Sequence, residues 1–153
     1  MDGSLLAELL LEKGCEIYGL VRRSSQKNYR NIQHLIDSDS INLIEGDLTD
    51  QSSLIEAVNI SRPDVIFNMA AQSFVGTSWQ TAQYTIDTTG LGLLRIMETV
   101  RHSNMKDKTK ILQASSSEMF GDVGGLLNED SPMRPRSPYG CAKVLAHNLA
   151  KVY

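Results

Sequence analysis

The sequence predicts an α/β fold with a parallel sheet, and three observations carry this prediction. Short apolar runs of strand length alternate with longer stretches whose apolar residues recur at helical spacing. This alternation runs along the whole chain and favours right-handed crossovers between parallel strands. With 153 residues, 41% of them hydrophobic, the chain has the size of one domain and can bury a core.

In the first half, Leu5, Leu6, Leu9 and Leu10 recur at helical spacing, and Gly14 suits the position just past a helix end. We expect the following elements to be a strand at 15–21, a helix at 28–36, a strand at 41–45 and a short helix around 54–58.

In the second half, residues 64–69 form an apolar run that predicts a strand. A helical pattern extends from about residue 80 to residue 101, and residues 110–114 predict the next strand. Residues 121–138 are rich in Gly and Pro and predict a loop, and residues 139–153 return to helical spacing.

Charge and composition exclude several classes of function. The net charge of −3 gives no broad attraction to nucleic acid or anionic lipid. No run approaches the roughly 18 apolar residues of a membrane span, and no signal-peptide core opens the chain. Cys15 and Cys141 lack metal or redox spacing, so we expect no metal site and two buried thiols in a reducing cytoplasm.

Two segments near the start suit a dinucleotide. Asp2 and Gly3 resemble the tail of a glycine-rich turn whose backbone N–H groups face a pyrophosphate, although an ordinary helix start would look alike. Residues 22–25, Arg-Arg-Ser-Ser, follow the predicted strand at 15–21. Arginine binds phosphate through paired, charged hydrogen bonds, so this segment favours the 2′-phosphate of NADP; the alternative is a solvated basic loop.

Two further strand ends carry candidate ligand groups. Asp47 and Leu48 close the strand at 41–45, where a carboxylate and a backbone N–H suit an adenine ring. Residues 69–73, Met-Ala-Ala-Gln-Ser, close the strand at 64–69, and their small side chains leave room for a flat ring system. Ligands collect at the carboxyl ends of parallel strands. Turn formation by Asp47 and core packing of the alanines are the alternatives.

The groups with chemical potential lie further along the chain. Tyr139 and Lys143 are four residues apart and therefore share one face of a helix. A nearby ammonium stabilises a phenolate, so this pair suits a general base near neutral pH. Ser116 offers a hydroxyl to the phenol or the substrate, and Glu118 follows it closely enough to face the same cleft.

These segments together resemble the extended short-chain dehydrogenases/reductases, and within them the GDP-mannose 4,6-dehydratase family. The resemblance implies a Rossmann-like doubly wound parallel sheet, with residues 1–153 forming part of the NAD(P)-binding domain. The matching strings are residues 2–14, 21–25, 46–50, 68–73, 115–118 and 135–139.

The resemblance also implies a reaction. Tyr139 takes the proton of the hydroxyl on carbon 4 of GDP-mannose as hydride leaves, while Lys143 holds the nicotinamide ribose. Glu118 removes the proton on carbon 5 and assists the loss of water from carbon 6. The hydride returns to carbon 6, and the product is GDP-4-dehydro-6-deoxy-mannose.

The same resemblance implies tightly bound NADP, a homo-oligomeric and cytoplasmic enzyme, and substrate contacts from Ser73, Ser116 and Glu118. The implied cofactor-binding positions are Asp2, Gly3, Arg22, Asp47, Leu48, Met69, Ala70, Ala71, Gln72, Ser73, Tyr84 and Lys143. Two positions depart from the family pattern, since Ser116 replaces a threonine and Phe74 replaces a histidine.

No strand pattern precedes Gly3, and the pattern ends in a helix at Tyr153. We therefore expect a sheet that lacks the family's first strand and its carboxyl-terminal substrate domain, with unpaired strand edges where the first strand would lie. The isolated chain is then expected to be an inactive fragment. A nucleotide-sugar epimerase or reductase of the same superfamily, and a non-catalytic nucleotide-binding module, are the alternatives.

Overall fold

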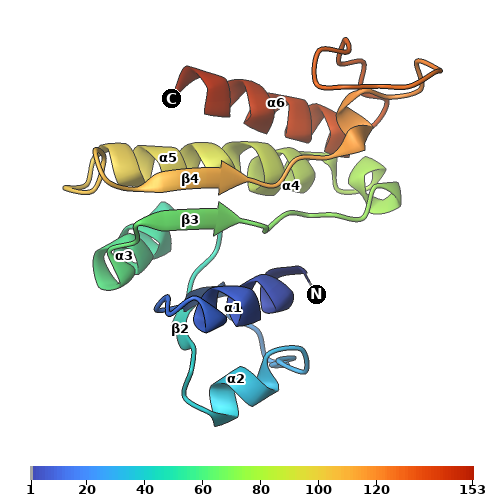
Figure 1. Ribbon diagram of the computed structural model, residues 1–153. Coiled ribbons are helices and arrows are strands. Elements are labelled where there is room, and N and C mark those ends of the chain that lie inside the picture. The colour runs from blue at the N-terminus through green and yellow to red at the C-terminus, as the bar shows by residue number, and fades with distance from the viewer. Residues whose placement is uncertain (1) are drawn as a thin grey trace.

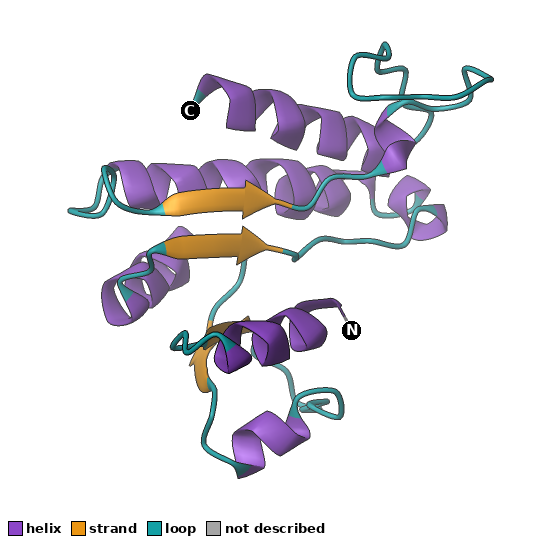
Figure 2. Cartoon of the chain, in the orientation of Figure 1, coloured by secondary structure: helices purple, strands orange, loops and turns teal. Residues whose placement is uncertain are grey.

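The computed structural model describes residues 2–153 and shows helices and parallel strands in alternation (Figures 1 and 2). Two two-stranded sheets carry the fold. The strands are β1 (Tyr18–Val21), β2 (Asn42–Glu45), β3 (Val65–Asn68) and β4 (Lys110–Gln113). The helices are α1 (Asp2–Glu12), α2 (Gln33–Asp37), α3 (Gln51–Ser61), α4 (Ala82–Thr85), α5 (Gly92–Arg101) and α6 (Pro138–Val152), with short helical segments η1 (Gly76–Trp79), η2 (Ile86–Leu91) and η3 (Ser117–Met119).

Both sheets are parallel, which confirms the predicted fold class. β1 pairs with β2 with Tyr18 opposite Asn42, and β3 pairs with β4 with Val65 opposite Lys110. Within residues 2–153 the two pairs are separate sheets, so each strand has a single partner. The separation agrees with the expectation of unpaired edges in the sheet.

The core lies between the β3–β4 pair and three helices. Ile66 and Ile111 pack against Leu54 of α3 and Ile96 of α5. Ile111 also contacts a second cluster formed by Leu93, Met97 and Ala146, which joins α5 to α6. Apolar burial of this kind contributes roughly 25 cal/mol per Å², so this face of β3–β4 fixes the helices over the sheet.

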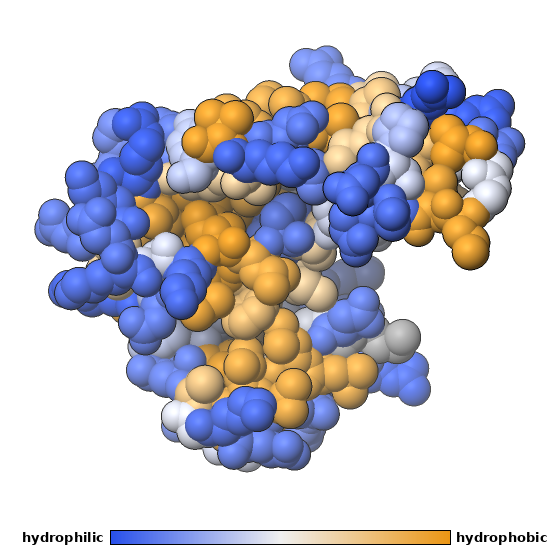
Figure 3. All heavy atoms as spheres, turned by 45° about the horizontal axis from the view of Figure 1, so that its top comes forward, coloured by the Kyte–Doolittle hydropathy of each residue, from blue (hydrophilic) through white to orange (hydrophobic). Residues whose placement is uncertain are grey.

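The opposite side of the molecule is less well covered. Val65 and Leu112, which alternate with the partly buried Ile66 and Ile111, are 42% and 48% exposed. Leu5 and Leu9 of α1 are also exposed, and Figure 3 shows apolar atoms gathered over the middle of the molecule. In residues 2–153, none of the helices combines the length and apolarity needed to cross a bilayer.

Local signals explain several element boundaries. Gly14, just past α1, has a φ of +77°, a conformation that glycine adopts without strain. Asp50 caps α3 by accepting a hydrogen bond from the Ser52 amide at 3.0 Å. Ser137 caps α6 in the same way through the Gly140 amide, and Pro138 occupies the first turn.

Three expectations about local structure were wrong. The predicted helix at 28–36 shrinks to Gln33–Asp37, since Asn28 turns its side chain to the Arg30 amide and competes with helical hydrogen bonding. The long helix at 80–101 is interrupted by the π-helical segment η2, where β-branched Thr88 and Thr89 precede Gly90. Cys15 and Cys141 are both exposed free thiols rather than buried residues.

A charged cluster joins the ends of α5 and α6. Glu98 accepts hydrogen bonds from Arg101 at 2.6 and 2.9 Å and also from the Tyr153 hydroxyl. These hydrogen bonds, those from Arg101 above all, lower the pKa of Glu98 from 4.5 to about 2. The Glu98 carboxylate therefore binds a proton more tightly in the unfolded chain than in the folded protein.

We expect the folded state to lose stability as the pH falls from 4.5 towards 2, because Glu98 is protonated in the unfolded chain before it is in the folded one. Glu98→Gln should flatten this part of the acid-unfolding curve, measured by circular dichroism. Glu56→Gln, on exposed α3 surface, serves as the matched control and should keep the wild-type curve. An unchanged curve in Glu98→Gln would show that this cluster does not contribute to stability at acidic pH.

Candidate active site

The carboxyl ends of β3 and β4 point to the end of the molecule where α6 begins (Figure 1). Tyr139 and Lys143 lie on the first two turns of α6 and are 8% and 3% exposed. The Lys143 ammonium lies 5.7 Å from the centroid of the Tyr139 ring, close enough for a cation–π contact. The predicted pairing of these two side chains is therefore present in the fold.

Lys143 of α6 is hydrogen-bonded to the residue that follows β4. Its Nζ donates a hydrogen bond of 2.8 Å to the backbone carbonyl of Ala114, the residue directly after β4. Burial lowers the pKa of Lys143 below its ordinary value of 10.5. A buried ammonium with one carbonyl partner retains hydrogen-bonding capacity for a ligand placed beside it.

Ser116 and Glu118 follow β4 in η3. The Ser116 hydroxyl accepts a hydrogen bond from the Glu118 amide at 3.2 Å and caps this short helix. A Cβ atom on Gly140 would lie only 2.7 Å from the Glu118 carbonyl oxygen, so glycine at this position lets η3 lie against the first turn of α6. The backbone of Glu118 is thereby placed beside the residue that follows Tyr139.

The side chain of Glu118 is exposed. Within residues 2–153, neither its carboxylate nor the Tyr139 hydroxyl takes part in a hydrogen bond or ion pair. The fold brings the two segments together and leaves both reactive groups available to a ligand. A common pocket for the two groups stays a prediction.

On the nucleotide side, Arg22 after β1 meets Tyr84 of α4, with Nη1 donating to the tyrosine oxygen at 2.9 Å. Asp47 lies after β2, and its Oδ1 accepts hydrogen bonds from the backbone and hydroxyl of Thr49 at 2.8 and 2.7 Å. Partial burial opposes ionisation, but these hydrogen bonds and the charges of Arg22 and Arg95 lower the pKa of Asp47 overall. Asp47 is thus both a turn former and an ionised neighbour of Arg22.

The loop after β3 is tethered to the helix beneath it. The backbone N–H of Gln72 donates to Thr89 Oγ1 at 3.1 Å, and Thr85 Oγ1 donates to the side-chain Oε1 of Gln72 at 3.3 Å. Both threonines are almost fully buried, whereas Ala70 and Ser73 of the loop are exposed. The exposed small residues form a surface that a flat ring can approach, and buried hydrogen bonds hold that surface in place.

The remaining predicted positions are placed as follows. Leu48 is 5% exposed and packs in the core, so only its backbone faces the strand ends. Met69 is 41% exposed, and Ala71 is half-buried. Asp2 and Gly3 open α1, and among residues 2–153 no atom outside the adjoining backbone lies within 4 Å of a Cβ placed on Gly3. That end of α1 therefore has room for a ligand.

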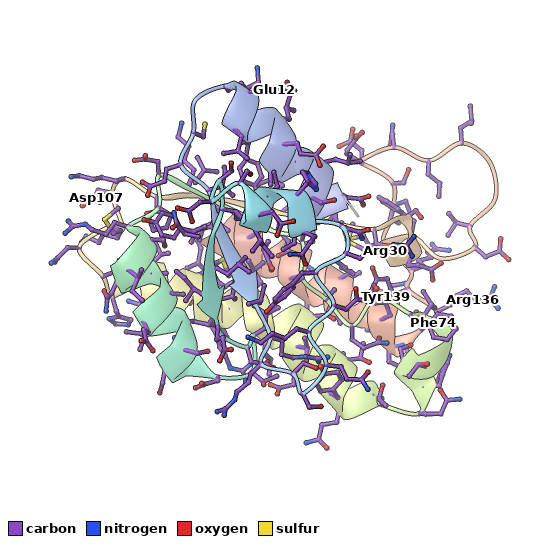
Figure 4. The ribbon with its side chains drawn as sticks, turned by 90° about the horizontal axis from the view of Figure 1, so that it is seen from below. Glu12, Arg30, Phe74, Asp107, Arg136 and Tyr139 are labelled. Carbon is purple, nitrogen blue, oxygen red and sulfur yellow. The ribbon has the colours of Figure 1, made fainter. Side chains whose placement is uncertain are left out.

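Sequence reasoning missed the role of Arg95. Its guanidinium pairs with Asp87 at 2.6 Å and donates to the Leu48 carbonyl at 3.1 Å, so it links η2 to the turn after β2. Figure 4 places Phe74, Arg136 and Tyr139 at one end of the molecule, far from Glu12 and Asp107. Phe74 is 70% exposed there.

A surface pocket of about 440 Å³ lies beside α4, and its lining does not include Ser116, Glu118, Tyr139 or Lys143. It adjoins Tyr84, the partner of Arg22, and is separate from Tyr139 and Lys143. The hydrogen bonds and buried side chains, rather than cavity size, therefore locate the site. The pocket is lined by Gln80, Thr81, Ala82, Gln83, Tyr84 and Asp87.

Comparison with known proteins gives this arrangement a family. A family model described as GDP-mannose 4,6 dehydratase matches residues 1–153. The chain belongs to the GDP-mannose 4,6 dehydratase family. The human GDP-mannose 4,6 dehydratase is 43% identical over 153 residues, covering 95% of this chain and 41% of the human protein. That of Yersinia enterocolitica is 45% identical over 158 residues, covering 99% and 42%. The chain thus spans about two fifths of the length of these relatives.

Solved structures of other proteins share the fold of this chain. Thermus thermophilus UDP-glucose 4-epimerase in complex with NAD matches with a TM-score of 0.86 and 27% identity, covering 100% of this chain and 47% of the epimerase. Bacillus anthracis dTDP-glucose 4,6-dehydratase in complex with NAD matches with a TM-score of 0.80 and 23% identity, covering 99% and 46%. The predicted Rossmann-like architecture is confirmed, in a chain that covers about half of each structure.

Proposed function

We propose that this chain carries the proton-transfer groups of an NADP-dependent GDP-mannose 4,6-dehydratase. The observation that carries the proposal is the buried Lys143 ammonium, 5.7 Å from the Tyr139 ring and seated on the Ala114 carbonyl at the end of β4. Lysine in this position has a carbonyl partner for its charge and two further N–H donors. Because the chain belongs to the GDP-mannose 4,6 dehydratase family, we propose GDP-mannose as the substrate on which this pair acts.

The donor set fits a nicotinamide dinucleotide with an extra phosphate. Arg22 uses one N–H group on Tyr84, which leaves further guanidinium N–H groups for a phosphate. The exposed Ala70 and the half-buried Ala71 leave a flat approach to the loop after β3. The groups proposed to hold NADP are those of Asp2, Gly3, Arg22, Asp47, Leu48, Met69, Ala70, Ala71, Gln72, Ser73, Tyr84 and Lys143. When bound, NADP accepts a hydride from carbon 4 of the sugar and returns it to carbon 6.

Tyr139 acts first in the proposed mechanism. Its phenolate oxygen takes the proton of the hydroxyl on carbon 4, so the electron pair of that O–H bond forms the new carbonyl as the hydride leaves. Lys143 stabilises the phenolate with its positive charge, and the Ser116 hydroxyl orients the sugar oxygen. Burial of Tyr139 and Lys143 limits the access of water to this step.

Glu118 acts second. The carbonyl at carbon 4 acidifies the hydrogen on carbon 5, and the Glu118 carboxylate takes that proton. The same carboxyl group then gives a proton to the hydroxyl leaving carbon 6, and water departs as the carbon–carbon double bond forms. Glu118 then takes a new proton from solvent and delivers it to carbon 5 as the hydride is added to carbon 6, so the sugar loses one water with no net oxidation.

A chimera tests this proposal, with this chain replacing the matching segment of the Yersinia enterocolitica enzyme, to which it is 45% identical. We expect the chimera to convert GDP-mannose to a product lighter by one water, detected by mass spectrometry. The isolated 153-residue chain is the comparison, and we expect little or no turnover from it because its strands form two separate pairs. A soluble chimera that binds NADP but makes no dehydrated product would contradict the proposal.

The preference for NADP is expected to depend on Arg22. In the chimera, Arg22→Ala should weaken NADP binding roughly tenfold or more, because a charge-assisted hydrogen bond contributes about 1.5–3 kcal/mol. NAD binding should change less than threefold, since NAD lacks the 2′-phosphate. Calorimetric titration of both cofactors measures the difference, and Arg62→Ala at the end of α3 is the control. Equal losses for NADP and NAD would show that Arg22 does not contact the phosphate.

A further inference from the structure

Two amide side chains meet at the carboxyl ends of the β3–β4 pair. Asn68 and Gln113 are the last residues of their strands and stand opposite each other in the parallel register. Asn68 Nδ2 donates to Gln113 Oε1 at 2.6 Å, and Asn68 is 4% exposed. Neither side chain has a part in the proposed chemistry, yet two amides are kept where apolar side chains would cost less to bury.

The direction of the hydrogen bonds is fixed at both ends by backbone groups. The Ala70 N–H can only donate, and it donates to Asn68 Oδ1 at 3.3 Å. The Ala114 carbonyl can only accept, and it accepts from Gln113 Nε2 at 2.8 Å. Each amide therefore has a single orientation that satisfies the network, and a carboxylate at position 113 could not replace the donor.

This network ends on the Ala114 carbonyl oxygen, which also accepts the hydrogen bond from Lys143. The Ala114 carbonyl accepts from Gln113 Nε2 and from Lys143 Nζ, each at 2.8 Å. The Ala114 N–H donates to the Asn68 carbonyl at 3.1 Å, so the residue is held through both of its backbone polar groups. A small rotation of this residue would move the proton acceptor away from the lysine.

We propose that Asn68 and Gln113 are positioning residues, whose cross-strand amide pair fixes the Ala114 carbonyl for Lys143 and ties it to the turn at Ala70. The pair thereby links the segment proposed to face the nicotinamide ring with the ammonium proposed to hold its ribose. This inference rests on the proposed function, since positioning matters only if Lys143 acts in the reaction. It assigns the pair no contact with substrate or cofactor.

The first test uses the cofactor-free 153-residue chain and reads Lys143 directly. In a ¹³C-lysine NMR titration, Gln113→Met should shift the pKa of Lys143 from its wild-type value, because the burial of the ammonium and its hydrogen bond to the Ala114 carbonyl both depend on where that carbonyl lies. Gln51→Met is the matched control, since Gln51 also makes two partly buried hydrogen bonds, to Thr99 and the Arg95 carbonyl. The control should lower the melting temperature similarly and leave the lysine titration unchanged.

If Gln113→Met fails to fold, Gln113→Glu retains the size and the acceptor for Asn68 while losing the donor to Ala114. It should raise the pKa of Lys143, because a carboxylate then lies near the ammonium. A wild-type titration of Lys143 in whichever variant folds would overturn the proposal. It would make the amide pair a structural contact only.

The second test uses the chimera. Gln113→Met should lower kcat roughly 2- to 10-fold, the effect of one hydrogen bond, while KM for GDP-mannose changes less than twofold. Gln51→Met should leave both constants within twofold of the parent. An inactive parent chimera would count against the proposed function alone, because the lysine titration decides the positioning proposal independently. Equal kinetic losses in the two variants would contradict positioning.

Discussion

Tyr139→Phe is expected to lower kcat of the chimera by about 10²- to 10⁴-fold, the range contributed by a general base. The substitution removes only the hydroxyl group and keeps the ring that the Lys143 ammonium faces at 5.7 Å. Because Tyr139 is only 8% exposed, phenylalanine fills the same space without a new cavity. Affinity for NADP should therefore stay within about threefold of the parent.

Steady-state kinetics with GDP-mannose and calorimetry with NADP measure the two expectations for Tyr139. Tyr18→Phe is the matched control, because it removes a hydroxyl whose hydrogen bond within residues 2–153 is to Glu16, at 2.8 Å. The control should retain parental kcat. Retention of more than a fifth of the parental kcat in Tyr139→Phe would show that another group removes the proton.

Glu118→Gln is expected to abolish dehydration, with product formation reduced by at least about 10²-fold, while the first hydride transfer remains. The amide matches the carboxylate in size but cannot take a proton from carbon 5. In the chimera, reduced nicotinamide should therefore accumulate and be visible by its near-ultraviolet absorbance. Solvent deuterium should no longer enter carbon 5.

Glu129→Gln provides the control for Glu118, since Glu129 is an exposed glutamate of the loop before α6. It should dehydrate GDP-mannose at the parental rate. This comparison also separates the proposed dehydratase from the superfamily's epimerases and reductases, whose chemistry needs no base at carbon 5. Parental dehydration by Glu118→Gln would make Glu118 a solvated loop charge.

Much of the fold was predictable because its signals are local. Gly14 ends α1, Asp50 begins α3, and Ser137 with Pro138 begins α6, each through a contact within a few residues. The strand runs were found because apolar runs of that length between helical patterns have few other solutions in an α/β chain. The reactive pair on α6 was predictable for the same reason, since four residues define one helix face.

The parts that escaped prediction depend on register or on distant partners. Asn68 and Gln113 read as ordinary strand ends until the pairing of β3 with β4 sets them opposite each other. The bond from Arg95 to the Leu48 carbonyl joins residues far apart in the sequence and has no local pattern. The π-helical segment η2 reads as continuous helix, because a widened turn keeps apolar residues near helical spacing.

Glu118 is a separate case. The backbone position of Glu118 follows from the packing of η3 against Gly140. Glu118 is exposed in this structure, and its shared pocket with Tyr139 stays a prediction.

The fate of one hydrogen tests the central claim most directly. GDP-mannose labelled with deuterium at carbon 4 is converted by the chimera, and the product is examined by NMR. We expect deuterium at carbon 6 and a solvent-derived hydrogen at carbon 5, because Tyr139 moves a proton while the hydride is kept and Glu118 exchanges its proton with water. A product that keeps deuterium at carbon 4, or has none on the sugar, would contradict the account.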